Sequence, residues 1–132
     1  MAFQVYKTVA GHVIPWEYLP CSAIQPKAGM AMVISSGKLA KCGATAAPTY
    51  ISMYEAPAAV AAGTIIPVIR VDHDTIFEVQ NQAQMTAAIG AKVTLHTDGL
   101  QVTNTTSSGV AEIVDYDAAA AAGAGGKVHV RF

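Results

Sequence analysis

Residues 30–42 read MAMVISSGKLAKC, a segment with the pattern of a β-hairpin. Two short runs of mostly apolar residues, 30–34 and 38–42, flank the turn Ser35-Ser36-Gly37. Two such runs separated by a few residues that include glycine predict a β-hairpin. The rest of the chain repeats this arrangement, with short apolar segments between Gly, Pro and Ser residues, so the sequence predicts a β-rich protein.

Further strands are expected on both sides of this hairpin. Residues 92–97 and 100–105 flank Asp98-Gly99, a pair that favours the tight turn of a second hairpin. The run at 65–71 should be buried on both faces, with a bulge or a sheet edge at Pro67, because proline has no N–H to donate. The other expected strands cover residues 3–9, 49–54, 76–79, 110–115 and 127–132.

Helical structure should be scarce. Residues 82–89 predict the only α-helix, a short one that is followed by Gly90. Residues 117–126, DAAAAAGAGG, are too few to hold an isolated helix, so we expect a loop with one helical turn. Together these elements predict one small, mainly β domain over residues 1–132, a barrel or a sandwich with one short helix.

Residues 1–12 are expected to form an N-terminal arm. Apolar and polar side chains alternate from Phe3 to Val9, which is typical of a strand, and Gly11 follows as a hinge. A terminal strand of this kind either completes the sheet of its own domain or adds to the exposed edge of a neighbour. The sequence leaves both arrangements open.

The composition restricts the function. Of 132 residues, 52% are hydrophobic and only 13% are charged, and the net charge is −1. This balance excludes a disordered polar tail, and we expect neither nucleic acid nor a membrane as a partner. No run of about 18 apolar residues occurs that could span a bilayer. So little charge on so apolar a chain indicates that other protein covers part of its surface.

The N-terminal residues lack the continuous apolar core of a secretory signal, so we expect the protein to fold in a cytoplasm. Cys21 and Cys42 form no CxxC pair, and in that reducing compartment they are expected to be free, buried thiols. Neither the cysteines nor the scattered histidines have the spacing of metal ligands. We therefore expect no metal and no cofactor.

The catalytic motifs are weak. Asp72-His73-Asp74 is the densest ionisable cluster, but neighbouring strand residues point to opposite faces, so we expect a solvated turn. His96 and Asp98 lie two residues apart without a third ligand nearby and are expected to form a surface pair. Residues 123–126, GAGG, are followed by an expected strand rather than a helix, which excludes a dinucleotide-binding loop. The chain is therefore expected not to be an enzyme.

The order of short motifs from residue 26 to residue 132 carries a resemblance. These motifs are KAG (27–29), GKL (37–39), PTYISM (48–53), IPVIRV (66–71), GAKVTL (90–95), DG (98–99), GVAEI (109–113) and VHVRF (128–132). The pattern resembles the small head-decoration (capsid cement) proteins of tailed bacteriophages. The resemblance implies a non-enzymatic virion protein, made in the bacterial host cytoplasm, that binds the outer surface of the phage head and stabilises it.

The same resemblance implies two partners, the major capsid protein and further copies of the chain in a homotrimer. It also implies that an N-terminal arm contributes to capsid binding, although no motif maps the contacts residue by residue. Trp16 is expected to pack in the core more readily than at an interface, because the chain has few other large side chains. The candidate capsid contacts are Phe3, Val5, Tyr6, Val9, His12 and Trp16.

Two other functions stay open. A small-ligand or carbohydrate-binding β-domain would need a concave aromatic cluster, which only Trp16, Tyr18, Tyr50 and Tyr54 could supply. A small β-barrel enzyme would need His73, His96 or His129 to converge with carboxylates that are distant in the sequence.

Overall fold

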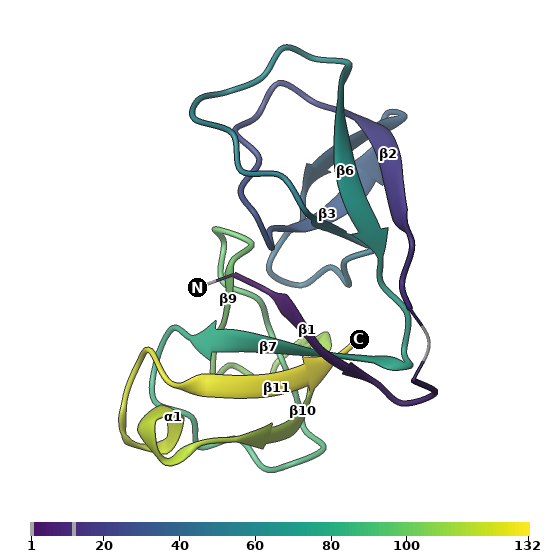
Figure 1. The fold of residues 1–132 in the computed structure, drawn as a ribbon. Helices are drawn as coiled ribbons and strands as arrows, with labels where there is room; N and C mark the ends of the chain where they lie inside the picture. The colour runs from purple at the N-terminus through teal and green to yellow at the C-terminus, as the bar shows by residue number, and fades with distance from the viewer. Residues whose placement is uncertain (1, 12) are drawn as a thin grey trace.

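The computed structural model describes residues 2–11 and 13–132 and confirms a mainly β fold (Figure 1). Its elements form two lobes, a small barrel-like lobe and an open sheet. The strands are β1 (Gln4–Thr8), β2 (Trp16–Cys21), β3 (Ala31–Ser35), β4 (Lys38–Lys41), β5 (Tyr50–Ser52), β6 (Thr64–Arg70), β7 (Thr75–Asn81), β8 (Lys92–Val93), β9 (Gln101–Val102), β10 (Ala111–Tyr116) and β11 (Lys127–Arg131). The helix α1 (Ala118–Ala122) lies between the last two strands.

The first lobe, which we call the barrel lobe, is built from β2 to β6. These strands pair in the closed order β2-β4-β3-β5-β6, and the long antiparallel ladder of β2 with β6 forms one wall. The ring is closed by a single parallel pair, Cys21 with Leu39. The N–H and hydroxyl of Ser22 strengthen this junction by donating to the carbonyl oxygen of Leu39 at 2.9 and 2.8 Å. The lobe thus combines features of a barrel and a sandwich.

The second lobe is a sheet in the order β1-β7-β11-β10-β8, with β9 parallel to β7. β1 is its edge strand and pairs antiparallel with β7 of the same chain, so the N-terminal strand completes the domain's own sheet. The barrel lobe is inserted between β1 and β7, which are distant in the sequence and adjacent in the sheet (Figure 1). Register shifts interrupt the ladders between Val5 and Lys7 and between Ile113 and Asp115.

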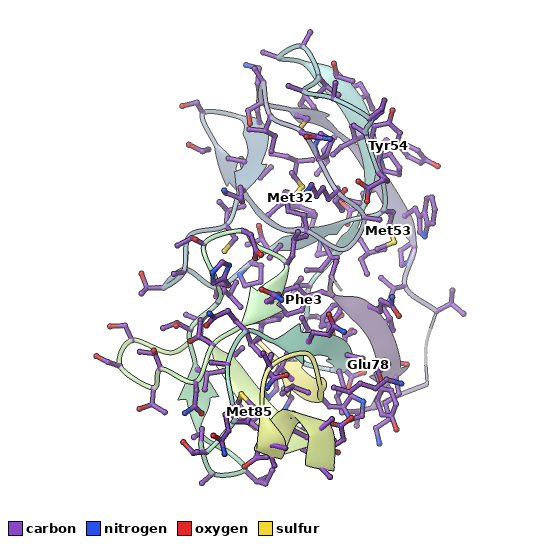
Figure 2. The ribbon with its side chains drawn as sticks, turned by 90° about the vertical axis from the view of Figure 1, so that its left-hand side faces the viewer. Phe3, Met32, Met53, Tyr54, Glu78 and Met85 are labelled. Atoms are coloured by element: carbon purple, nitrogen blue, oxygen red, sulfur yellow. The ribbon has the colours of Figure 1, made fainter. Side chains whose placement is uncertain are left out.

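One hydrophobic core joins the two lobes. It contains Ala31 and Ile51 from the barrel lobe together with Phe77 and other apolar residues of the sheet. Phe3 lies where the lobes meet (Figure 2) and packs edge-on against Phe77, with ring centroids 6.4 Å apart. The residues just before β1 pack closely against the barrel lobe, because a Cβ at Gly29 (φ +79°) would lie 2.5 Å from the Cβ of Ala2.

The first predicted hairpin is confirmed. β3 and β4 pair up to Ser35 and Lys38, so Ser36 and Gly37 form a two-residue turn. Both residues have positive φ, 50° and 75°, which is the backbone twist that two-residue hairpins favour. The second predicted hairpin is also present, with Gly99 of its turn at φ 73°. Its two segments join through the antiparallel bridge of Leu95 with Val102 and through the N–H of His96, which donates to the carbonyl oxygen of Gln101 at 2.9 Å. The flanking β8 and β9 pair in addition with β10 and β7.

The helix expected at residues 82–89 is wrong. This segment is a loop, because its backbone N–H groups donate to other elements: Met85 to the carbonyl of Ala120 at 2.9 Å, and Thr86 and Ala87 to the side chain of Asn104. Among the described residues the one helix is the short α1, so the helical turn expected within residues 117–126 is confirmed.

Asn81, the last residue of β7, holds the segment that contains α1. Its fully buried amide donates to three carbonyl oxygens, those of Ala83 (2.7 Å), Ala120 (3.1 Å) and Gly123 (2.6 Å). The side-chain oxygen of Asn81, Oδ1, accepts the N–H of Gly126 at 2.7 Å. The backbone here is so close that a Cβ at Gly126 would lie 2.1 Å from the nitrogen of Ala120. The side chain of Asn81 therefore supplies hydrogen bonds that a neighbouring strand would otherwise provide to the backbone around α1.

Pro67 lies opposite Tyr18 in a ladder without a register shift, so the expected bulge is absent. On its other side the carbonyl oxygen of Pro67 accepts the N–H of Met53 at 2.9 Å, just beyond the last β5 pair of Ser52 with Val68. Because β6 has a strand on each side, the expected sheet edge is absent as well. The expectation that residues 65–71 are buried on both faces is wrong, because 59% of Ile65 is exposed. This face of β6 is therefore exposed at Ile65, whereas Ile69 at its other end is buried in the core.

Candidate functional site

The outer face of the β2–β6 ladder carries exposed apolar side chains, and we call it the ladder face. Trp16, Tyr18 and Ile65 are 55%, 64% and 59% exposed. The register places all three on the same side, because Trp16 pairs with Ile69, Tyr18 with Pro67, and Pro20 with Ile65. The core packing expected for Trp16 is therefore wrong.

The opposite face of the same ladder explains why these side chains are not needed in the core. Cys21, Ile66 and Val68 point into the barrel lobe and are buried, together with Met32 and Leu39 from neighbouring strands. These inner residues already fill the lobe. Large apolar residues that gather on an outer face without a core role are typical of a surface that binds another protein.

An apolar groove runs between the ladder face and β1. It consists of two adjoining cavities of about 310 and 320 Å³, which share Val5 and Met53 in their walls. Trp16 lines the first cavity, and Phe3 lines the second. The lining residues are uncharged, so the groove extends the apolar surface of the ladder face toward the edge of the sheet.

The predicted contact residues fall into different environments. Phe3 is 1% exposed and belongs to the core, so it is not available to a partner while β1 is docked. Val5 and Val9 are exposed, and Val5 also lines the groove. Tyr6 is half-exposed and packs against the sheet. His12 lies outside the described residues.

His129 stands at the centre of a second cluster, on the outer face of the sheet. Its Nδ1 lies 2.5 Å from the Oδ1 atom of Asp115, and its Nε2 lies 3.1 Å from the Oε1 atom of Glu78. The ring of Tyr6 stacks on the imidazole, with centroids 3.8 Å apart and planes 21° apart. The imidazole is largely covered, since only 15% of the side chain of His129 is exposed.

The cluster joins four strands, β1, β7, β10 and β11. The two register shifts of the sheet flank it, one at Tyr6 and one before Asp115. A bulge re-aims the side chains around it, which accounts for a Tyr6 ring that reaches across β7 to His129. The alternation of Lys127, His129 and Arg131 predicts that His129 faces outward, but the partners from three other strands carry no signal in the sequence.

His129 is the histidine that converges with two carboxylates, as the enzyme alternative requires. One face of its imidazole is covered by Tyr6, and both ring nitrogens contact carboxylates rather than a hydroxyl or thiol. General acid–base or nucleophilic catalysis needs a ring nitrogen within reach of the reacting group. The geometry instead suits a contact that holds strands together.

The turn at residues 72–74 and the pair of His96 with Asp98 are present as expected. Asp72 accepts the N–H of Asp74 at 2.9 Å and the hydroxyl of Thr75 at 3.1 Å, and His73 contacts the carbonyl oxygen of Phe132 at 2.8 Å, so this segment is a turn. His96 and Asp98 form a half-exposed pair at 3.1 Å. Among the residues that the structure describes, no three His, Cys, Asp or Glu side chains form a group that could hold a metal ion.

The cysteines are free and buried, as predicted. Burial raises the pKa of the Cys42 thiol to about 11, and it also raises the pKa of Cys21. The Sγ atom of Cys42 donates to the carbonyl oxygen of Ala46 at 2.9 Å. Both thiols are therefore protonated at neutral pH, and neither is an activated nucleophile.

The four aromatic residues named for ligand binding do not line one concavity. Tyr50 is buried in the barrel lobe, with the guanidinium of Arg70 at 5.0 Å from its ring centroid. Trp16 and Tyr18 lie on the ladder face, and of the four only Trp16 lines the groove. Within the described residues, no helix is long and apolar enough to cross a bilayer.

Comparison with protein-family models, with curated proteins and with solved structures finds no match to this chain.

Proposed function

We propose that the protein is a non-enzymatic capsid decoration (cement) protein, which binds the outer surface of a tailed-phage head and stabilises it. The observation that carries this proposal is the ladder face, with Trp16, Tyr18 and Ile65 more than half exposed on one side of the two paired strands β2 and β6. Aromatic and apolar residues at the centre of a contact supply most of its binding energy. The resemblance in motif order supplies the class of partner, the major capsid protein.

Self-association into a homotrimer forms part of the proposal. Several weak contacts per copy hold an assembly firmly when the copies are linked, because binding of one copy raises the effective concentration of the others. Sedimentation of the free protein and its stoichiometry on purified particles test this. A chain that is monomeric at high concentration and binds capsids as isolated single copies refutes the trimer.

The binding experiment uses expanded capsids assembled from the major capsid protein of the same genome, mixed with the purified protein and separated by sedimentation. Ile65→Ser should weaken binding, whereas Ile89→Ser should not, because Ile89 is equally exposed (61% against 59%) but lies outside the ladder face. Capsids that bind none of the wild-type protein refute the proposed function. Equal binding by both variants and the wild type refutes the role of the ladder face.

A second function, binding of a small apolar ligand, is favoured by the groove alone. Its two cavities of about 310 and 320 Å³ lie at the lower end of the range for ligand sites, roughly 300–1,000 Å³. Trp16 is the only tryptophan of the chain and lines the groove, so its fluorescence reports occupancy directly. Titration with naphthalene should change this emission in a saturable way, and an unchanged spectrum refutes this second function.

A further inference from the structure

The stack of Tyr6 on His129 joins the edge strand to the interior of the sheet. Tyr6 comes from β1, and its ring lies on the imidazole of His129 with centroids 3.8 Å apart. His129 comes from β11, which is separated from β1 by β7. The stack therefore ties β1 to the sheet at a point beyond its immediate ladder partner.

The contacts of the imidazole require a particular protonation state. Both ring nitrogens face carboxylate oxygens, at 2.5 Å for Asp115 and 3.1 Å for Glu78, and a carboxylate only accepts hydrogen bonds. A neutral imidazole has one N–H, so one of the two contacts would then set a lone pair against a carboxylate. The imidazolium has two N–H groups and satisfies both.

We propose that the charged form of His129 acts as a pH-sensitive clamp that holds the N-terminal strand β1 on the sheet. A cation over the face of an aromatic ring is attracted by the negative charge of that face, and this attraction is larger where water is partly excluded. The charged imidazole is held in position by Asp115 and Glu78 and presents its face to Tyr6. When it loses its proton, both the attraction to Tyr6 and one carboxylate contact are lost.

The charges around the clamp come from every strand packed against it. Lys7 on β1 lies 5.9 Å from the ring centroid of Tyr6. On the sheet, Lys127 lies 3.9 Å from Glu78, so Glu78 faces both a lysine and the imidazole. Arg131 and Glu112 pair with each other at 3.3 Å, one position along the same face.

The sign of the pH dependence follows from this. The docked state of β1 is favoured while the imidazole is charged, and this preference is lost as the pH rises and the ring loses its proton. The expected change in the opening equilibrium of β1 is about threefold to tenfold, the range of a single partly buried cation–π contact. An opened β1 uncovers the edge of β7, so the clamp regulates whether this edge is available for pairing.

Amide hydrogen exchange of the free wild-type protein, measured at about pH 5.5 and at about pH 8.5, tests the proposal. After correction for the intrinsic exchange rate, the β1 amides should open about threefold to tenfold more at the higher pH. The amides of the β2–β6 ladder serve as the internal reference and should not change. Wild-type β1 amides with no pH dependence overturn the proposal.

Two variants locate the effect. His129→Gln and Tyr6→Leu should each abolish the pH dependence of β1 exchange, whereas His96→Gln should retain it, since His96 pairs with Asp98 far from the clamp. Retention of the pH dependence in either clamp variant, or its loss in His96→Gln, overturns the assignment. If the variants do not fold, the wild-type NMR titration decides: β1 amide shifts must follow the midpoint of the His129 ring, and a different midpoint refutes the clamp.

Discussion

Replacement of Asn81 by Ala should destabilise the protein more than any loss of a surface hydrogen bond. The substitution removes one acceptor and one amide that serves three carbonyl oxygens. The buried N–H of Gly126 loses the side-chain oxygen that it now contacts at 2.7 Å. A buried donor left without a partner costs roughly 1–3 kcal/mol. This is the largest part of the expected effect.

The three carbonyl groups contribute less. Ala120 keeps a second donor, the N–H of Met85 at 2.9 Å. Ala83 and Gly123 are only half-buried, so water replaces part of what they lose. Together with the Gly126 amide, the loss comes to about 3 kcal/mol. For a chain of this length that corresponds to a melting temperature lower by about 10 °C.

Thermal and urea denaturation measure this difference, and Asn104→Ala is the matched control. Asn104 also accepts two backbone N–H groups, at 2.9 and 3.0 Å, but it is not buried, so its loss should cost only about 1 kcal/mol. Asn81→Asp should be at least as harmful as Asn81→Ala, because its carboxylate would face three carbonyl oxygens. Equal destabilisation by Asn81→Ala and Asn104→Ala would show that burial of this network contributes nothing.

Three further predictions concern single residues. Gly29→Ala should lower the melting temperature more than Gly63→Ala. Both glycines have positive φ, but of the two only Gly29 would bring the new Cβ against other atoms, at 2.5 Å. An equal fall in melting temperature for both variants would contradict the close packing around Gly29. Asp117 accepts the N–H groups of Ala120 and Lys127, and these bonds lower the pKa of its carboxyl group. Asp117→Asn should therefore reduce the melting temperature at neutral pH. This difference from the wild type should shrink as the pH falls through the range where the folded carboxyl is protonated. A difference that grows in acid contradicts this sign. Burial raises the pKa of Cys42 to about 11, so iodoacetamide should label neither thiol of the native protein at pH 8 within the time that labels both in urea; rapid native labelling would refute the burial of these cysteines.

The sequence predicts those parts of the fold that depend on neighbouring residues. The turn at Ser36-Gly37 needs two residues with positive φ, and the short apolar runs beside it need only their own alternation, so this hairpin is visible in the sequence. Asp117 at the start of five alanines likewise marks α1, because the capping bond to Ala120 spans three residues.

The parts that depend on distant residues were not predictable. The pattern at residues 82–89 is helical by itself, but the N–H groups of Met85 and Thr86 are taken by Ala120 and Asn104, which lie far along the chain. The exposure of Trp16 depends on whether Ile66 and Val68 already fill the barrel lobe. The contacts of His129 with Tyr6, Glu78 and Asp115 likewise require the register of four strands.

The insertion of the barrel lobe between β1 and β7 has a consequence for the order of folding. A pair such as Gln4 with Glu78 closes a loop of more than 70 residues, and its entropy cost falls once the barrel lobe has formed within that loop. The pairs inside the barrel lobe, such as Ser35 with Lys38, close far shorter loops. We therefore expect residues 16–70 to become protected first in pulse-labelling of the refolding chain, and β1 to be protected last. A nascent chain would then carry its N-terminal strand undocked until β7 has been synthesised, which leaves that strand open to pairing with another chain during synthesis.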